Sequence, residues 1–183
     1  GMMTEVVLGK RLRVLIRPQG LEDADRLWGL YSSLSSKTRT LSGIPERLDE
    51  QGFRERMTNL ARHQHRYVCA VRSPKERFIG YFGVDTPEDP RTGWIFLFVH
   101  DDYQGQGLGR EILAYMIEEA PLLGLKTLKC QVYVENKPAI SLLQRYGFQK
   151  EKEWSDLESG KSSYTMSRAV TTSLCSTPQR RGL

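Results

Sequence analysis

The feature that most constrains the fold is a glycine-rich run between an apolar segment and a helix-like segment. Residues 93–99, GWIFLFV, are apolar after the glycine, which predicts a central β-strand with both faces buried. Residues 103–113, YQGQGLGREIL, follow with glycines at three alternate positions and then a helical pattern. Glycine costs conformational entropy and weakens the start of a helix. We therefore expect this turn to have a task that requires a bare backbone.

Three phosphate-binding motifs could explain the glycine turn, and they differ in spacing. A dinucleotide fingerprint needs G-x-G-x-x-G, whereas Arg110 stands here at the place of its third glycine. A P-loop needs a lysine and a hydroxyl residue after its last glycine, and neither follows. The third motif is a turn whose backbone N–H groups meet an anion at a helix N-terminus. Gly105, Gly107 and Gly109 would let the anion approach closely, while Gln104 adds a donor and Arg110 a charge.

The hydrophobic periodicity of the chain predicts one α/β domain over residues 8–169. Strands are expected at residues 12–18, 66–72, 77–85, 93–99, 127–134, 148–154 and 162–169, and helices at residues 21–34, 48–62, 110–124 and 136–148. Pro121 is expected to end the third helix early, and Gly147 to end the fourth in a left-handed conformation. Residues 1–7 and the polar residues 170–183 are expected to be flexible termini.

Composition excludes several classes of protein. Hydrophobic residues make up 39% of the 183 residues, which is enough for a core. No apolar run approaches the ~20 residues that span a bilayer, and the N-terminus lacks the apolar region of a secretory signal. Gly1 ahead of Met2 is interpreted as a residue left by an expression vector. These observations favour a cytoplasmic protein.

The metal, redox and nucleic-acid alternatives are not favoured by the residue types. Three cysteines and three histidines show no disulfide framework and no metal-ligand spacing, so we expect no metal. The net charge of +5 is spread among interspersed acidic residues. Nucleic-acid-binding proteins usually cluster their basic residues, whereas this balance equally suits a nucleotide-containing ligand.

Two segments together resemble the GNAT superfamily of N-acetyltransferases. VHDDYQGQGLG, residues 99–109, is similar to the pyrophosphate loop of that family, whose motif Q/R-x-x-G-x-G/A is met by Gln104, Gly107 and Gly109. NKPAISLLQRYGF, residues 136–148, is similar to its second cofactor segment. The resemblance implies a mixed, mostly antiparallel sheet with helices on both faces and splayed central strands.

The resemblance also implies acetyl-CoA as the cofactor and assigns residues to it. Backbone groups near Phe98 and Val99 would pair with the pantetheine arm, the amides of residues 104–109 would hold the pyrophosphate, and Asn136 would hold the cofactor from the other side. The expected cofactor-binding residues are Phe98, Val99, Gln104, Gly105, Gln106, Gly107, Leu108, Gly109, Arg110 and Asn136. Asn136 also fits a helix N-cap, and the two roles are compatible.

The proton path is less defined, because the chain departs from the family pattern. The strand at residues 93–99 carries no carboxylate, and Leu143 stands where the family often has a tyrosine. Tyr146 occupies what is usually an apolar core position. His100 is the nearest group of suitable pKa and is our candidate general base, with Asp85 as second choice. His100 is equally explained as a solvated loop residue, with water as the proton relay.

The function that these features favour is acetyl transfer to a primary amine by direct attack on a thioester. The alternative is a non-enzymatic module that binds acyl-CoA as a sensor or interaction partner. Polyamines, antibiotics, amino acids, ribosomal N-termini and protein lysines all remain possible acceptors, and a homodimer is common in the family. Trp28, Tyr31 and Phe53 could line an acceptor pocket, but helical spacing favours the core.

Overall fold

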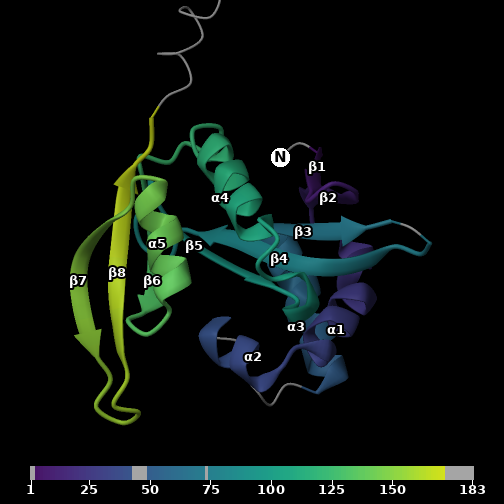
Figure 1. The fold of residues 1–183 in the computed structure, drawn as a ribbon, viewed down its shortest axis with the longest axis horizontal. Helices are drawn as coiled ribbons and strands as arrows, with labels where there is room; N and C mark the ends of the chain where they lie inside the picture. The colour runs from purple at the N-terminus through teal and green to yellow at the C-terminus, as the bar shows by residue number, and fades with distance from the viewer. Residues whose placement is uncertain (1–2, 43–48, 73, 172–183) are drawn as a thin grey trace, which may run out of the picture. The chain divides into compact units, whose positions relative to one another are not determined.

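The computed structural model describes residues 3–42, 49–72 and 74–171 (Figure 1). The strands form one mostly antiparallel eight-stranded sheet in the order β1-β2-β3-β4-β5-β6-β8-β7. The chain divides into two compact units. The first comprises Gly1–Val84 and Phe96–Ile112, and the second comprises Asp85–Ile95 and Leu113–Leu183. The expected tail at residues 170–183 lies, from residue 172 onward, outside the described residues.

The first unit begins with strands that pair in antiparallel fashion. They are β1 (Thr4–Leu8), β2 (Leu12–Pro18), β3 (His65–Val71) and β4 (Arg77–Asp85). The expectation of a flexible terminus at residues 1–7 is wrong for β1, which pairs with β2 from Thr4–Ile16 to Leu8–Leu12. A glycine with φ of +59° at Gly9 allows the tight turn between them.

Helices of the first unit supply part of its aromatic core, beside Tyr81 and Phe98 of the strands. α1 (Ala24–Ser33) and α3 (Glu50–His63) lie side by side (Figure 1). The rings of Tyr31 and Phe53 stack with centroids 4.7 Å apart, and Trp28 meets Phe53 edge-on at 5.4 Å. Tyr31 and Phe53 are only 3% and 4% exposed. The core interpretation of these two residues is therefore confirmed.

A short helix follows α1 in a segment where the periodicity predicts no regular element. α2 spans Ser36–Ser42. Its start is explained by Ser35, whose Oγ accepts a hydrogen bond from the backbone N of Thr38 at 3.2 Å. This is the N-cap interaction that serine favours. Serine and threonine are weak helix formers, so the composition of this segment concealed the helix.

Three further elements are a strand and two short 3-10 turns. β5 spans Thr92–Val99, η1 is a 3-10 turn at Leu21–Asp23, and η2 is a 3-10 turn at Asp101–Tyr103. α4 then runs over Leu108–Glu119. It stops two residues before Pro121, as the sequence predicted, because proline lacks the N–H that a helix interior needs.

The second unit contains β6 (Thr127–Tyr133), α5 (Lys137–Arg145), β7 (Gln149–Ser155) and β8 (Ser162–Ala169). β6 is parallel to β5 over Thr92–Trp94, and it pairs with β8 along its whole length. Gly147 follows α5 with φ of +87°, which confirms the left-handed stop. The described residues include no helix of the length and apolarity needed to cross a bilayer.

Candidate functional site

The glycine turn folds into a loop directly before α4. Gly105 and Gly107 have φ of +76° and +95°, a region that residues with a side chain rarely adopt. The sequence therefore needs glycine at these two positions. Gly109 differs, because it lies inside the first turn of α4 without a positive φ. Leu108 is fully buried and fixes the start of the helix.

The loop presents a series of backbone donors at the N-terminus of α4. The first intrahelical hydrogen bond runs from Glu111 N to Gly107 O at 3.2 Å. Among the residues that the structure describes, no hydrogen bond is recorded for the N–H groups of residues 105–110. The first N–H groups of any helix lack an internal partner, and the helix dipole adds positive potential there. This loop can therefore bind an anion.

Arg110 lies close to the loop although its side chain belongs to α4. A Cβ atom on Gly107 would be 3.1 Å from Nη2 of Arg110. The guanidinium thus folds back over the glycine turn instead of extending away from it. It adds a full positive charge beside the backbone donors, as the sequence predicted.

The side chain of Gln104 has a different role from the one expected. Its Nε2 donates to Thr38 Oγ1 at 3.1 Å and to Val99 O at 2.9 Å. Both amide hydrogens are therefore engaged within the protein, and none remains for a phosphate. Gln104 holds the turn in place, and the anion donors are the backbone groups that follow it.

Asp101, in the turn η2, forms hydrogen bonds with the segment that joins α1 to α2. Its carboxylate accepts hydrogen bonds from Ser35 N at 3.0 Å, from Ser35 Oγ at 2.6 Å and from Thr38 Oγ1 at 2.5 Å. Partial burial by itself would raise the pKa of Asp101, but these donors outweigh it and lower the pKa to about 2. Asp101 is thus a carboxylate at neutral pH. The sequence alone does not indicate this role of Asp101, because its partners lie more than 60 positions away.

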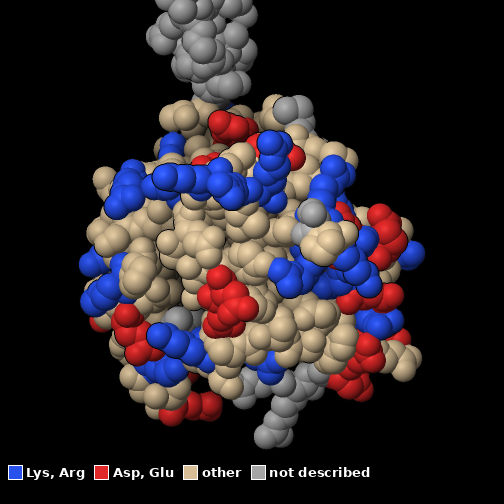
Figure 2. Space-filling model, turned by 45° about the vertical axis from the view of Figure 1, so that its right-hand side comes forward, with Lys and Arg blue, Asp and Glu red and all other residues tan. Residues whose placement is uncertain are grey.

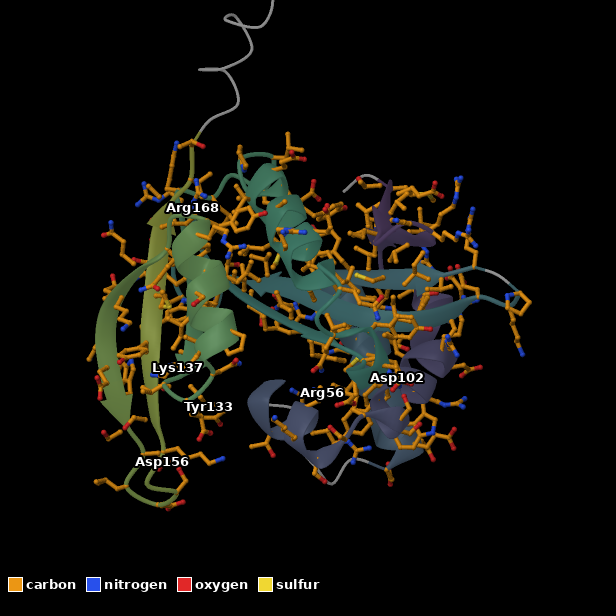
Figure 3. The ribbon with its side chains drawn as sticks, in the orientation of Figure 1. Arg56, Asp102, Tyr133, Lys137, Asp156 and Arg168 are labelled. Carbon is orange, nitrogen blue, oxygen red and sulfur yellow. The ribbon has the colours of Figure 1, made fainter. Side chains whose placement is uncertain are left out.

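His100 stands between β5 and η2 as the N-cap of that turn. Its Nδ1 accepts a hydrogen bond from Asp102 N at 3.1 Å, and its ring meets that of Tyr103 edge-on at 5.9 Å. Figure 3 labels Asp102 on this turn. With Nδ1 as an acceptor, neutral His100 carries its hydrogen on Nε2. Taking up a proton would therefore require Nδ1 to release the N–H of Asp102.

The end of β5 contributes backbone groups as well as core side chains. Phe98 and Val99 are 9% and 8% exposed. The backbone N of His100 donates to Ile79 O in β4 at 2.8 Å. Successive residues of a strand direct their backbone groups to opposite sides. The N–H of Val99 therefore points away from β4.

Asn136 and Asp85 belong to the second unit. Asn136 Oδ1 accepts a hydrogen bond from Ala139 N at 3.4 Å, which confirms the helix-capping role at α5, whose first residue, Lys137, is labelled in Figure 3. Asp85 is partly buried at the end of β4. Leu143 is buried, and Tyr146 is the partly exposed C-cap of α5. Its carbonyl accepts a hydrogen bond from Arg168 at 2.7 Å.

The charges on the face shown in Figure 2 are of mixed sign. On the face shown in Figure 2, lysine and arginine occur in several groups with acidic side chains beside them. No group of three or more histidine, cysteine or acidic residues within the described ranges could hold a metal ion. Cys69 and Cys130 are buried free thiols, and burial raises the pKa of Cys130 to about 12.

Comparison with known proteins relates this arrangement to one family. The Acetyltransferase (GNAT) family matches residues 27–148, which include the glycine turn and α5. A spermine/spermidine N(1)-acetyltransferase of Bacillus subtilis is 38% identical over 66 residues, covering 34% of this chain and 43% of that protein. The ribosomal protein bS18-alanine N-acetyltransferase of Escherichia coli is 44% identical over 50 residues, covering 27% and 34%. The chain thus matches less than half the length of these relatives.

A solved structure extends the likeness to the whole fold. The spermidine N-acetyltransferase of Vibrio cholerae, in complex with CoA and spermine, superposes with a TM-score of 0.74. The superposition covers 88% of this chain and 98% of that one, at 16% sequence identity. At this level of identity, the comparison shows a shared fold.

Proposed function

The chain belongs to the acetyltransferase (GNAT) family, and from this premise we propose that it is an acetyl-CoA-dependent N-acetyltransferase acting on a primary amine. The observation that carries the proposal is the series of backbone N–H groups at residues 105–110, which no other group of the described chain engages. A pyrophosphate is the anion that such a series, placed at a helix N-terminus, suits best.

The residues present fit acetyl-CoA. Gly105 and Gly107 keep the loop bare, and a Cβ at Gly107 would crowd the guanidinium of Arg110. We assign the N–H groups of residues 105–110 and the charge of Arg110 to the pyrophosphate, and Asn136 to a further contact. When bound, acetyl-CoA supplies a thioester whose acetyl group an amine can accept.

The end of β5 is assigned to the arm of the cofactor that carries the thioester. The N–H of Val99 points away from β4, and we assign it as the donor that stabilises the developing negative charge on the thioester oxygen. The carbonyl of Val99, in the next peptide group, accepts a hydrogen bond from Gln104 at 2.9 Å, and the N–H of that group donates to Ile79 O at 2.8 Å. The backbone directly after the donor is therefore held on both sides. A fixed donor is more effective than a mobile one because it needs no reorganisation during the reaction.

His100 is assigned as the group that receives the proton of the attacking amine, with a water molecule as intermediary. A lysine-like amine has a pKa near ~10.4 and arrives protonated at neutral pH. The exposed fraction of the His100 side chain is 18%, so water can reach it. The bond from Asp102 to Nδ1 must open for this step. His100→Asn, discussed below, tests the assignment.

The acceptor class is proposed at the level of the amine. Two relatives are named for spermine or spermidine and for an N-terminal alanine of a ribosomal protein. A polyamine and a protein N-terminus are therefore the first acceptors to test, followed by protein lysine. Assembly as a homodimer is part of the proposal, and light scattering of the purified chain tests it.

Two measurements test the proposed function. Isothermal titration calorimetry with CoA and acetyl-CoA should give saturable binding with a stoichiometry of one per chain. Release of the CoA thiol should then exceed the hydrolysis background with at least one member of an amine panel containing spermidine, an Ala-initiated peptide and a lysine peptide. Absence of binding would overturn the proposal. Binding without turnover on the panel would favour the non-enzymatic acyl-CoA sensor.

A further inference from the structure

Thr38 occupies a central place in the hydrogen bonds of the glycine turn. Its hydroxyl donates to Asp101 Oδ1 at 2.5 Å and accepts from Gln104 Nε2 at 3.1 Å. Asp101 is the first residue of η2, and Gln104 is its C-cap, immediately before Gly105. One buried hydroxyl, in a residue only 7% exposed, thus contacts both ends of the segment that leads into the loop.

The donors and acceptors of this cluster balance without a conflict. The Thr38 hydroxyl has one hydrogen, which goes to Asp101, and its oxygen receives one from Gln104. The Ser35 hydroxyl also donates to Asp101 and accepts from Thr38 N. The second amide hydrogen of Gln104 goes to Val99 O. The Ser35 hydroxyl also lies 3.2 Å from Thr38 Oγ1, but its shorter contact, 2.6 Å, is to the Asp101 carboxylate. With the hydrogens assigned in this way, the cluster favours one arrangement of the turn.

We propose that Thr38 is a positioning residue for cofactor binding: it holds the segment from Asp101 to Gln104 so that the N–H groups of residues 105–110 point toward one anion. The inference rests on the proposed function, because the anion is the pyrophosphate of acetyl-CoA. Thr38 does not touch the cofactor. It acts through Gln104 and Asp101, and through Gln104 it also fixes the carbonyl of Val99.

The alternative explanation of Thr38 is a purely structural role at the start of α2. The cap of that helix uses Ser35 Oγ and the backbone N of Thr38, which any residue at position 38 other than proline supplies. The hydroxyl of Thr38 is therefore not needed for the cap. The hydroxyl lies 3.2 Å from Ser35 Oγ, and its contacts to Asp101 and Gln104, at 2.5 and 3.1 Å, are both at η2. Its loss should therefore act on the turn more than on the helix.

The test compares Thr38→Val with Thr38→Ser and Thr40→Val. Valine keeps the shape of threonine and removes the hydroxyl, whereas serine keeps the hydroxyl. Thr40→Val makes the same change on the same helix, where the hydroxyl donates to Ser36 O at 2.8 Å within the helix. We expect Thr38→Val to weaken CoA binding by about tenfold, and the other two variants to bind within about twofold of the unmodified chain.

The kinetic readout separates positioning from simple loss of stability. Thr38→Val should raise KM for acetyl-CoA more than it lowers kcat, because the donors are present but less well aligned. Thermal unfolding without CoA and circular dichroism establish that each variant is folded. If Thr38→Val does not fold, Gln104→Met takes its place in the test and should also weaken CoA binding, because it removes the same contact to Thr38. Gln104 is exposed, so this substitution should not prevent folding.

Failure of this inference differs from failure of the proposed function. If the unmodified chain binds no CoA, the proposed function is wrong. If it binds CoA and a folded Thr38→Val binds equally well, Thr38 is not a positioning residue and the proposed function stands. A double variant, Thr38→Val with Gln104→Met, should bind CoA no more weakly than whichever single variant has the lower affinity. Additive losses would overturn the coupling of the two residues.

Discussion

In the loop before α4, Nη2 of Arg110 lies 3.1 Å from the place that a Cβ atom would take on Gly107. A side chain at position 107 must therefore displace the guanidinium and also adopt a φ of +95°, which costs ~1–2 kcal/mol for residues other than glycine. We expect Gly107→Glu to abolish CoA binding, because its carboxylate would enter the anion site and repel the phosphates. Isothermal titration calorimetry with CoA checks this.

A matched pair of alanine variants separates backbone strain from crowding of Arg110. Gly105 also has a positive φ, of +76°, but a Cβ there would have no atom within 4 Å. Gly105→Ala should thus weaken CoA binding less than Gly107→Ala. Equal affinities of Gly107→Glu and the unmodified chain would refute the placement of the anion in this loop.

The glycine turn was predictable from the sequence because the requirement is local. A strand, two glycines with positive φ and a helix follow one another directly between Thr92 and Glu119. Neighbouring residues in the sequence are enough to indicate such an arrangement. The core role of Tyr31 and Phe53 was predictable for the same reason, since helical spacing places them on one face. The position of Asn136 as a cap was likewise encoded next to its helix.

The tertiary contacts of the turn were not predictable. Gln104 had the appearance of a ligand donor, but both hydrogens of its amide are used by Thr38 and Val99. Asp101 carried no motif, because its importance depends on Ser35 and Thr38 in a segment rich in common polar residues. β1 was not predicted, because four of its five residues are exposed or half-buried and such a short segment resembles a flexible terminus.

The second prediction concerns the proton path. His100→Asn keeps an acceptor for the N–H of Asp102 and suits an N-cap, but asparagine cannot take up a proton. If His100 is the general base, kcat/KM for the amine should fall by about 10²-fold or more at neutral pH, while the Kd for CoA stays unchanged. Steady-state kinetics and calorimetry measure the two quantities. A variant with full activity would assign His100 to the turn alone.

The third prediction concerns the buried carboxylate of Asp23 in the first unit. Asp23 is 0% exposed and accepts two hydrogen bonds from Arg17, at 2.7 and 3.0 Å, and one from Arg26 at 3.0 Å. Asp23→Asn would remove the buried counter-charge of these guanidinium groups and leave them Glu76, at 3.8 Å from Arg17 and 2.6 Å from Arg26. We expect a loss of about 3–5 kcal/mol in the free energy of unfolding. Urea denaturation checks this. Asp25→Asn, at an exposed ion pair with Arg54, should cost at most about 1 kcal/mol.

The pH dependence of stability supplies an independent check on Asp23. Burial alone would raise its pKa, but the hydrogen bonds from Arg17, Gly20 and Arg26 lower it below the ordinary value of 3.8. The stabilisation is therefore present above pH 3.8 and is lost as the pH falls through the lower pKa of the folded state. The difference in stability between the unmodified chain and Asp23→Asn should narrow below that pH. A constant difference would show that the charge of Asp23 is not responsible.

The last prediction separates the two roles assigned to Asn136. Its Oδ1 caps α5 through Ala139 N, so Asn136→Ala should lower the free energy of unfolding by about 1 kcal/mol. Asn136→Asp keeps the cap oxygen and places a negative charge at a helix N-terminus, where the dipole favours it. We therefore expect the aspartate variant to be as stable as the unmodified chain. It should bind acetyl-CoA several-fold more weakly, because the new carboxylate would repel the anionic ligand. Unchanged affinity in Asn136→Asp would mean that Asn136 serves the helix and not the cofactor, and the cofactor contacts would then be confined to the end of β5 and the loop before α4.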